Sequence, residues 1–83
     1  MNIVQTAVPT VRPLPEVMQE VLDAVQRARS QGYAPDLKVK DLRWQFDQVS
    51  AKMNQAVYND QSDSIHDTCL ETVAVLIEML ARS

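Results

Sequence analysis

Apolar residues recur every three or four positions through the middle of the chain, with polar residues at most positions between them. This seam consists of Val39, Leu42, Phe46, Val49, Met53 and Ala56. The spacing is typical of a helix that packs its apolar side against another helix. It predicts a helix over residues 37–59 that pairs with a neighbouring helix.

Two more helices are predicted, one on each side of the seam. Residues 15–31 open with a proline, which loses no needed hydrogen bond in a first helical turn, and stop before Gly32. Residues 63–82 carry apolar side chains on two faces of a predicted helix, so each face should pack against a different neighbour. We expect one face to pack in the core and the other to form a dimer interface. The core face consists of Ile65, Cys69, Val73, Leu76 and Leu80, and the interface face of Thr72, Val75 and Met79.

Residues 1–14 lack a helical period and contain prolines at positions 9 and 13, which predicts an extended arm. Val8 and Val11 are apolar enough to pack on a neighbouring subunit, and the alternative is a disordered leader over residues 1–5. The predicted fold is therefore all-α. It has an arm over residues 1–14 and a single helical domain over residues 15–83, which pairs into a helical-bundle homodimer.

Length and composition favour this pairing. A chain of 83 residues buries a small fraction of its surface, and a single cysteine excludes an intrachain disulfide. Oligomerisation is then the expected source of stability. The sequence shows no secretory leader and no apolar run of membrane length, so we expect a cytoplasmic protein with no membrane contact. The net charge of −3, without a dense basic stripe, makes nucleic acid an unexpected partner.

Side chains that could carry chemistry are few. One histidine and one cysteine cannot supply the four ligands of a structural zinc site, and one glycine cannot make a phosphate-binding loop. Three carboxylates, those of Asp63, Asp67 and Glu71, follow one another at intervals of four residues on the last predicted helix. Like charges in this arrangement persist either as a solvated face or because a cation binds there. The solvated face is the more common outcome.

Three segments together resemble a known family. They are residues 21–36 (VLDAVQRARSQGYAPD), residues 42–53 and residues 67–82 (DTCLETVAVLIEMLAR), so the likeness covers roughly residues 18–82. Their spacing and apolar texture are similar to those of the small phage and bacterial MazG-like proteins, which are all-helical nucleoside triphosphate pyrophosphohydrolases.

The resemblance implies that acidic residues on two helices hold Mg²⁺ against the triphosphate, with Asp67 and Glu71 on the second of these helices. At the place of the acids on the first helix, this chain departs from the family. It has one carboxylate and two neutral amides there, in the segment Trp44-Gln45-Phe46-Asp47-Gln48. Amides add no charge to hold Mg²⁺, so the resemblance fits a homologue that kept the scaffold better than it fits a working enzyme.

Two functions are therefore expected, in this order. The first is a small non-enzymatic homodimer without a cofactor that binds and regulates or inhibits a protein partner, as phage-encoded or bacterial antagonists do. Aromatic and arginine side chains outside the seam would make the contact, namely Trp44, Tyr58, Tyr33 and Arg43. Trp44 itself is either such an anchor or a residue that another helix covers.

The second expected function is a Mg²⁺-dependent MazG-like pyrophosphohydrolase, or a protein that sequesters nucleotides. Its catalytic residues would be Asp47, Asp67 and Glu71, and its metal ligands Asp63, Asp67 and Glu71.

Overall fold

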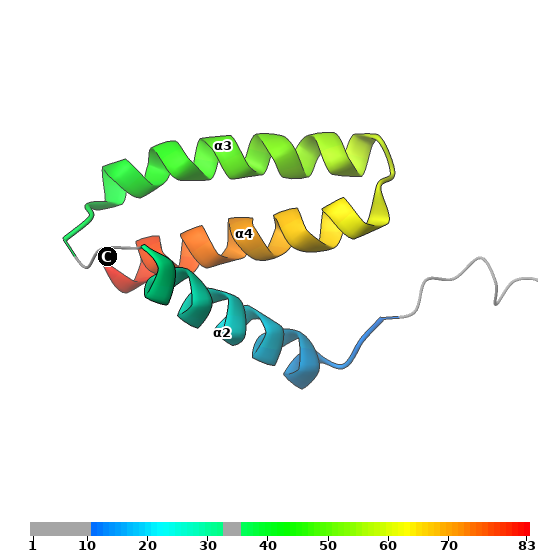
Figure 1. Cartoon of the computed structure of the whole chain (residues 1–83), viewed down its shortest axis with the longest axis horizontal. Coiled ribbons are helices and arrows are strands. Elements are labelled where there is room, and N and C mark those ends of the chain that lie inside the picture. The colour runs from blue at the N-terminus through cyan, green and yellow to red at the C-terminus, as the bar shows by residue number, and fades with distance from the viewer. Residues whose placement is uncertain (1–10, 33–35) are drawn as a thin grey trace, which may run out of the picture.

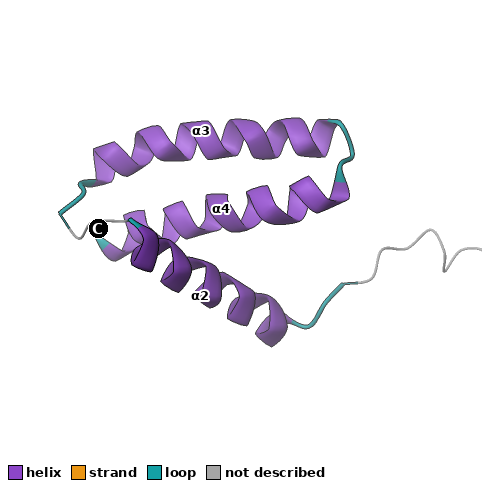
Figure 2. Cartoon of the chain, in the orientation of Figure 1, coloured by secondary structure: helices purple, strands orange, loops and turns teal. Residues whose placement is uncertain are grey.

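Three α-helices make up the computed structural model, which describes residues 11–32 and 36–83. They are α2 (Leu14–Gln31), α3 (Val39–Tyr58) and α4 (Ser62–Ala81), and no strand occurs in these ranges (Figures 1 and 2). The prediction of an all-α chain with three helices is confirmed. Each helix begins and ends within two residues of the predicted position.

Local chemistry explains where the helices begin and end. Pro15 lies in the first turn of α2, and Gly32 ends the helix with its backbone N–H donating to the carbonyl of Ala28 (3.1 Å). At the start of α3 the backbone N–H of Lys38 donates to the carboxylate of Asp41 (3.1 Å). The turn between α3 and α4 passes through Asp60 in the left-handed region (φ 54°), which aspartate tolerates better than most residues.

Helix α4 is the centre of the fold. It packs against α3 on one side and against α2 on the other, whereas α2 and α3 do not pack against each other within the described ranges (Figure 1). A tight turn makes α3 antiparallel to α4. Helix α2 runs in the same direction as α4, because Glu20 contacts His66 near their starts and Arg29 contacts Glu78 near their ends. The three helices therefore form one layer with two open faces.

The core is small and lies where α4 meets its neighbours. Its fully buried large side chains are Leu42, Val75 and Glu78, and its other buried residues are Val25, Ala56, Thr72 and Ala74. The seam of α3 supplies Leu42 and Ala56, while Phe46, Val49 and Met53 are half-buried. The seam is thus the side of α3 that contacts another helix, and that helix is α4.

The core face predicted for α4 is wrong. Leu76 and Leu80 are 45% and 72% exposed, and Ile65, Cys69 and Val73 are half-buried. The chain instead turns the opposite face inward, including Thr72 and Val75. Thr72 and Val75 are 5% and 1% exposed in a single chain, so they offer almost no surface to a second copy, and Met79, the third residue of the predicted interface face, is half-buried. Two residues on this face, Thr72 and Ala74, are small. They favour burial of this face, because small side chains let neighbouring helices approach closely.

Glu78 is a carboxylate in the core, and two arginines hold it there. Nε and Nη2 of Arg29 donate to its two oxygens (2.7 and 3.0 Å), and Nη1 of Arg82 donates to Oε1 (2.8 Å). Nε of Arg82 also donates to the carbonyl of Leu37 (2.8 Å), just before α3. The hydrogen bonds from Arg29 and Arg82 lower the pKa of Glu78, against the opposing effect of burial. One ionic cluster therefore joins all three helices at the end where α4 stops.

Candidate functional site

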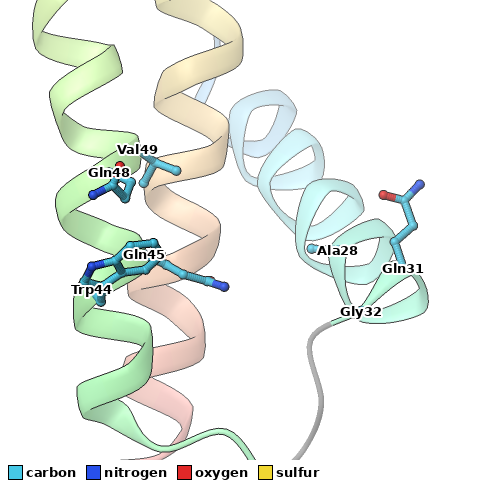
Figure 3. Close-up of a pocket in the computed structure, with 7 residues that line it drawn as sticks. All are labelled: Ala28, Gln31, Gly32, Trp44, Gln45, Gln48 and Val49. Carbon is cyan, nitrogen blue, oxygen red and sulfur yellow. The ribbon is translucent and has the colours of Figure 1, made fainter.

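An open groove lies between α2 and α3, and α4 forms part of its floor. One cavity of about 350 Å³ lies between α2 and α3 (Figure 3) and is lined by Ala28, Gln31, Gly32, Trp44, Gln45, Gln48 and Val49. A second cavity of about 510 Å³ reaches α4 and is lined by Ala24, Arg27, Ala28, Gln31, Val49, Asp67, Leu70, Glu71 and Ala74. The two cavities share Ala28, Gln31 and Val49, so they form one continuous depression, the α2–α3 groove.

Trp44 lines this groove and is 65% exposed. Figure 3 shows its indole ring and the Gln48 side chain projecting from α3, with Ala28 and Gln31 on the facing helix. Of the two interpretations of Trp44 from the sequence, coverage by another helix does not apply within the described ranges. An exposed tryptophan beside a cavity is the type of side chain that most often anchors a protein interface.

Gln45 lines the groove and has an unsatisfied polar atom beneath the groove surface. Its side-chain oxygen Oε1 is buried and accepts no hydrogen bond from any described residue. An amide oxygen left in this state costs about 1–3 kcal/mol.

The groove also carries charge at the α4 side. Arg27, Asp67 and Glu71 line the larger cavity, and the side chains of Asp63, Asp67 and Glu71 are all exposed. Asp47 lines neither cavity and pairs with Arg43 (3.4 Å) one turn away on the surface of α3. The structure therefore brings together two members of the acidic set, and in the described ranges no group of three His, Cys, Asp or Glu side chains is placed to hold a metal ion.

The remaining residues predicted to bind a partner lie elsewhere. Tyr58 is 89% exposed at the end of α3, about 21 Å along the helix from Trp44 by the rise per residue. Arg43 is exposed but engaged with Asp47. Val11 is exposed ahead of α2, and Val8 and Tyr33 lie outside the described residues. Of the predicted partner-binding residues that the structure describes, Trp44 is the one that lines the groove.

A second ionic cluster, which sequence reasoning missed, links the starts of α2 and α4. Glu20 accepts a hydrogen bond from Nη1 of Arg12 (2.6 Å) and lies 3.1 Å from Nε2 of His66. The hydrogen bonds from Arg12 and His66 lower the pKa of Glu20 to about 2, and the same contact with Glu20, aided by Asp67, raises the pKa of His66. No spacing in the sequence indicated this cluster, because its members come from segments far apart in the chain.

The contact between Glu20 and His66 is expected to weaken as pH rises. Because the folded-state pKa of His66 is raised, the stabilisation is fully present below the ordinary value of 6.5 and is lost as pH rises through the folded pKa. An NMR titration of the imidazole protons should give a midpoint above 6.5, which Glu20→Gln lowers.

Glu16→Gln is the matched control, because Glu16 pairs with Arg12 (3.6 Å) and not with His66. It should leave the His66 midpoint unchanged. A wild-type midpoint at or below 6.5 would show that the contact does not form in solution.

Comparisons with protein-family models, with curated proteins and with solved structures found no match to this chain. None of the three described helices combines the length and apolar character that a bilayer span requires.

Proposed function

We propose that this protein is a small non-enzymatic helical homodimer that binds, and so regulates or inhibits, a protein partner. The observation that carries the proposal is the exposure of Trp44 at the open α2–α3 groove. Exposing an indole ring to water is unfavourable, and covering it with a partner's apolar side chain recovers that cost. The groove would hold one helix or extended segment from the partner between its two helical walls.

The lining of the groove indicates the chemistry of such a segment. Ala28, Val49 and Leu70 suit an apolar side chain. Asp67 and Glu71 at the α4 side favour a basic residue. The segment that fits best is amphipathic, with apolar residues toward Trp44 and a lysine or arginine toward α4.

Trp44→Ala tests this proposal. The change should alter the free energy of unfolding by less than about 0.5 kcal/mol, because the ring is mostly exposed. It should weaken partner binding by about 2 kcal/mol or more, roughly 30-fold, if Trp44 is the anchor. The measurement is the retention of a stoichiometric partner on the immobilised wild-type and variant proteins.

Tyr58→Ala is the matched control, an exposed aromatic residue of the same helix that lies outside the groove. A partner retained by wild type and Tyr58→Ala and lost from Trp44→Ala supports the proposal. The proposal is contradicted if Trp44→Ala retains the partner as well as wild type does, or if Tyr58→Ala loses the partner.

A second candidate, the Mg²⁺-dependent pyrophosphohydrolase or nucleotide-sequestering protein, has one observation in its favour. Asp67, Glu71 and Arg27 line the same cavity of about 510 Å³, and Mg²⁺ often binds through two carboxylates and the phosphates of a nucleotide. Release of pyrophosphate from nucleoside triphosphates, abolished by Asp67→Ala, would place this function first. Nucleotide binding without release, abolished by the same variant, would favour sequestration.

A further inference from the structure

The side of the helical layer opposite the groove is apolar. On α4 the groove is lined by Asp67, Leu70, Glu71 and Ala74. A helix turns about 100° per residue, so the opposite side of α4 carries a different stripe. This stripe consists of Ile65, Cys69, Val73, Leu76 and Leu80 and contains no charged residue. All four acidic residues of α4 lie on the groove side or in the core.

Helices α2 and α3 extend this surface by the same geometry. Residues of α2 that line the groove are Ala24, Arg27, Ala28 and Gln31, and the exposed Met18 and Leu22 lie on the other side of that helix. The residues of α3 that line the groove are Trp44, Gln45, Gln48 and Val49. The exposed Val39 and Val57 lie on the other side of α3. We call the resulting surface the apolar back, and its exposed apolar members are Met18, Leu22, Val39, Val57, Leu76 and Leu80. Two arginines lie on the same sides of α2 and α3, and each is paired within the chain, Arg29 with Glu78 and Arg43 with Asp47.

We infer that a second copy of this chain covers the apolar back, so that two helical layers pack back to back and both α2–α3 grooves face outward. This inference rests on the proposed homodimer and assigns its interface. A helical domain normally needs two layers to enclose a core, and one chain supplies only one layer. A two-fold dimer supplies the second layer with an identical apolar surface.

The size of the apolar back fits a stable dimer. Helices of 20 residues are about 30 Å long and pack about 9 Å apart, so α3, α4 and the adjoining half of the 18-residue α2 present a projected area of about 660 Å². A specific interface of standard size buries about 800 Å² on each partner.

Charge and spacing on α4 also suit self-pairing. Near a two-fold axis each residue lies close to its own copy, so a charge there would face a like charge. The stripe on α4 has none. Cys69, Val73, Leu76 and Leu80 follow one another at intervals of four, three and four residues, which is the spacing of a helix–helix seam. We therefore place α4 of each copy at the centre of the interface.

This arrangement has a functional consequence. Because the grooves lie on the outer surfaces, one dimer presents two copies of Trp44 and binds two partner segments at once. Two sites on one body raise the avidity for a partner that is itself dimeric or repetitive.

Sedimentation across a concentration series tests the inference. Wild type should approach twice the 9.4 kDa of one chain. Leu76→Lys combined with Leu80→Lys should sediment near 9.4 kDa with unchanged helix content by circular dichroism, because the two side chains are 45% and 72% exposed in the single chain. Gln48→Lys, an exposed groove position, is the matched control and should remain dimeric.

Three results would overturn the inference: a wild type that stays at one chain mass, a lysine double variant that stays dimeric, or a Gln48→Lys variant that dissociates. Val57→Lys tests the same surface from α3 if the double variant loses helix content. The two failures are distinguishable. A partner that binds Trp44→Ala as well as wild type contradicts the groove without changing the mass of the dimer. A monomeric wild type contradicts the homodimer but leaves partner binding at Trp44 measurable.

Discussion

Leu42→Ala is expected to destabilise the chain by about 2–5 kcal/mol, the range for truncating a buried leucine. Leu42 is fully buried in the seam of α3, and the helix has no other described neighbour than α4 to close the cavity that alanine would leave. A small domain is stable by about 5–15 kcal/mol in total, so a loss of this size removes a large share of it. Urea unfolding followed by circular dichroism measures the effect, at a fixed protein concentration because dimerisation contributes to the apparent stability.

Leu14→Ala is the matched control for this truncation. Leu14 is 69% exposed in the first turn of α2, so the same chemical change should alter the free energy of unfolding by less than about 0.5 kcal/mol. A loss below about 1 kcal/mol at Leu42 would contradict its position in the core.

Arg82→Met is expected to destabilise the chain by about 3 kcal/mol, since it removes charge-assisted hydrogen bonds and leaves part of a buried carboxylate uncompensated. Glu78 is 1% exposed, and Arg82 also holds the carbonyl of Leu37. Arg29 remains bonded to Glu78, which limits the loss. Arg43→Met is the control, because Arg43 makes one exposed pair with Asp47 and should contribute less than about 0.5 kcal/mol.

A second change separates the charge effect from lost packing. In the Arg82→Met background, Glu78→Gln removes the uncompensated charge and should recover part of the stability. Low pH should instead destabilise the wild type, in which Glu78 is paired with both arginines. The pKa of Glu78 is lowered in the folded state, so its contribution is present above its ordinary value near 4.5 and is lost as pH falls through the folded pKa. Equal destabilisation by Arg82→Met and Arg43→Met would contradict the role of the cluster.

The helices could be predicted from the sequence because their signals are local. The apolar seam of α3, Pro15 at the start of α2 and Gly32 at its end each act within one or two turns. The same reasoning identified α4 as a helix with two apolar faces and failed on which face turns inward. Besides the small residues Thr72 and Ala74, the buried face is determined by Glu78, whose charge indicates a surface residue until Arg29 and Arg82 are placed beside it.

The groove was only partly predictable. Trp44 lies off the seam, a position that left open whether another helix covers it, and the structure leaves it 65% exposed beside the groove. The sequence did not predict that α2 forms the side of the groove opposite Trp44. Helix α3 follows α2 in the chain, yet α2 packs on α4 and leaves a gap between itself and α3. Contacts between distant segments, rather than local patterns, determine this part of the molecule.

The distance between the two grooves of a dimer tests the central claim, that the apolar back faces inward and Trp44 faces outward. A spin label at Gln48→Cys, in a chain carrying Cys69→Ser, reports this distance without altering Trp44 or the proposed α4 seam beyond one sulfur atom. Two helical layers, each about 10 Å thick, should separate the labels by more than about 20 Å. A separation below about 15 Å is too short for two layers to lie between the labels. It would show that the grooves face each other and would contradict this arrangement.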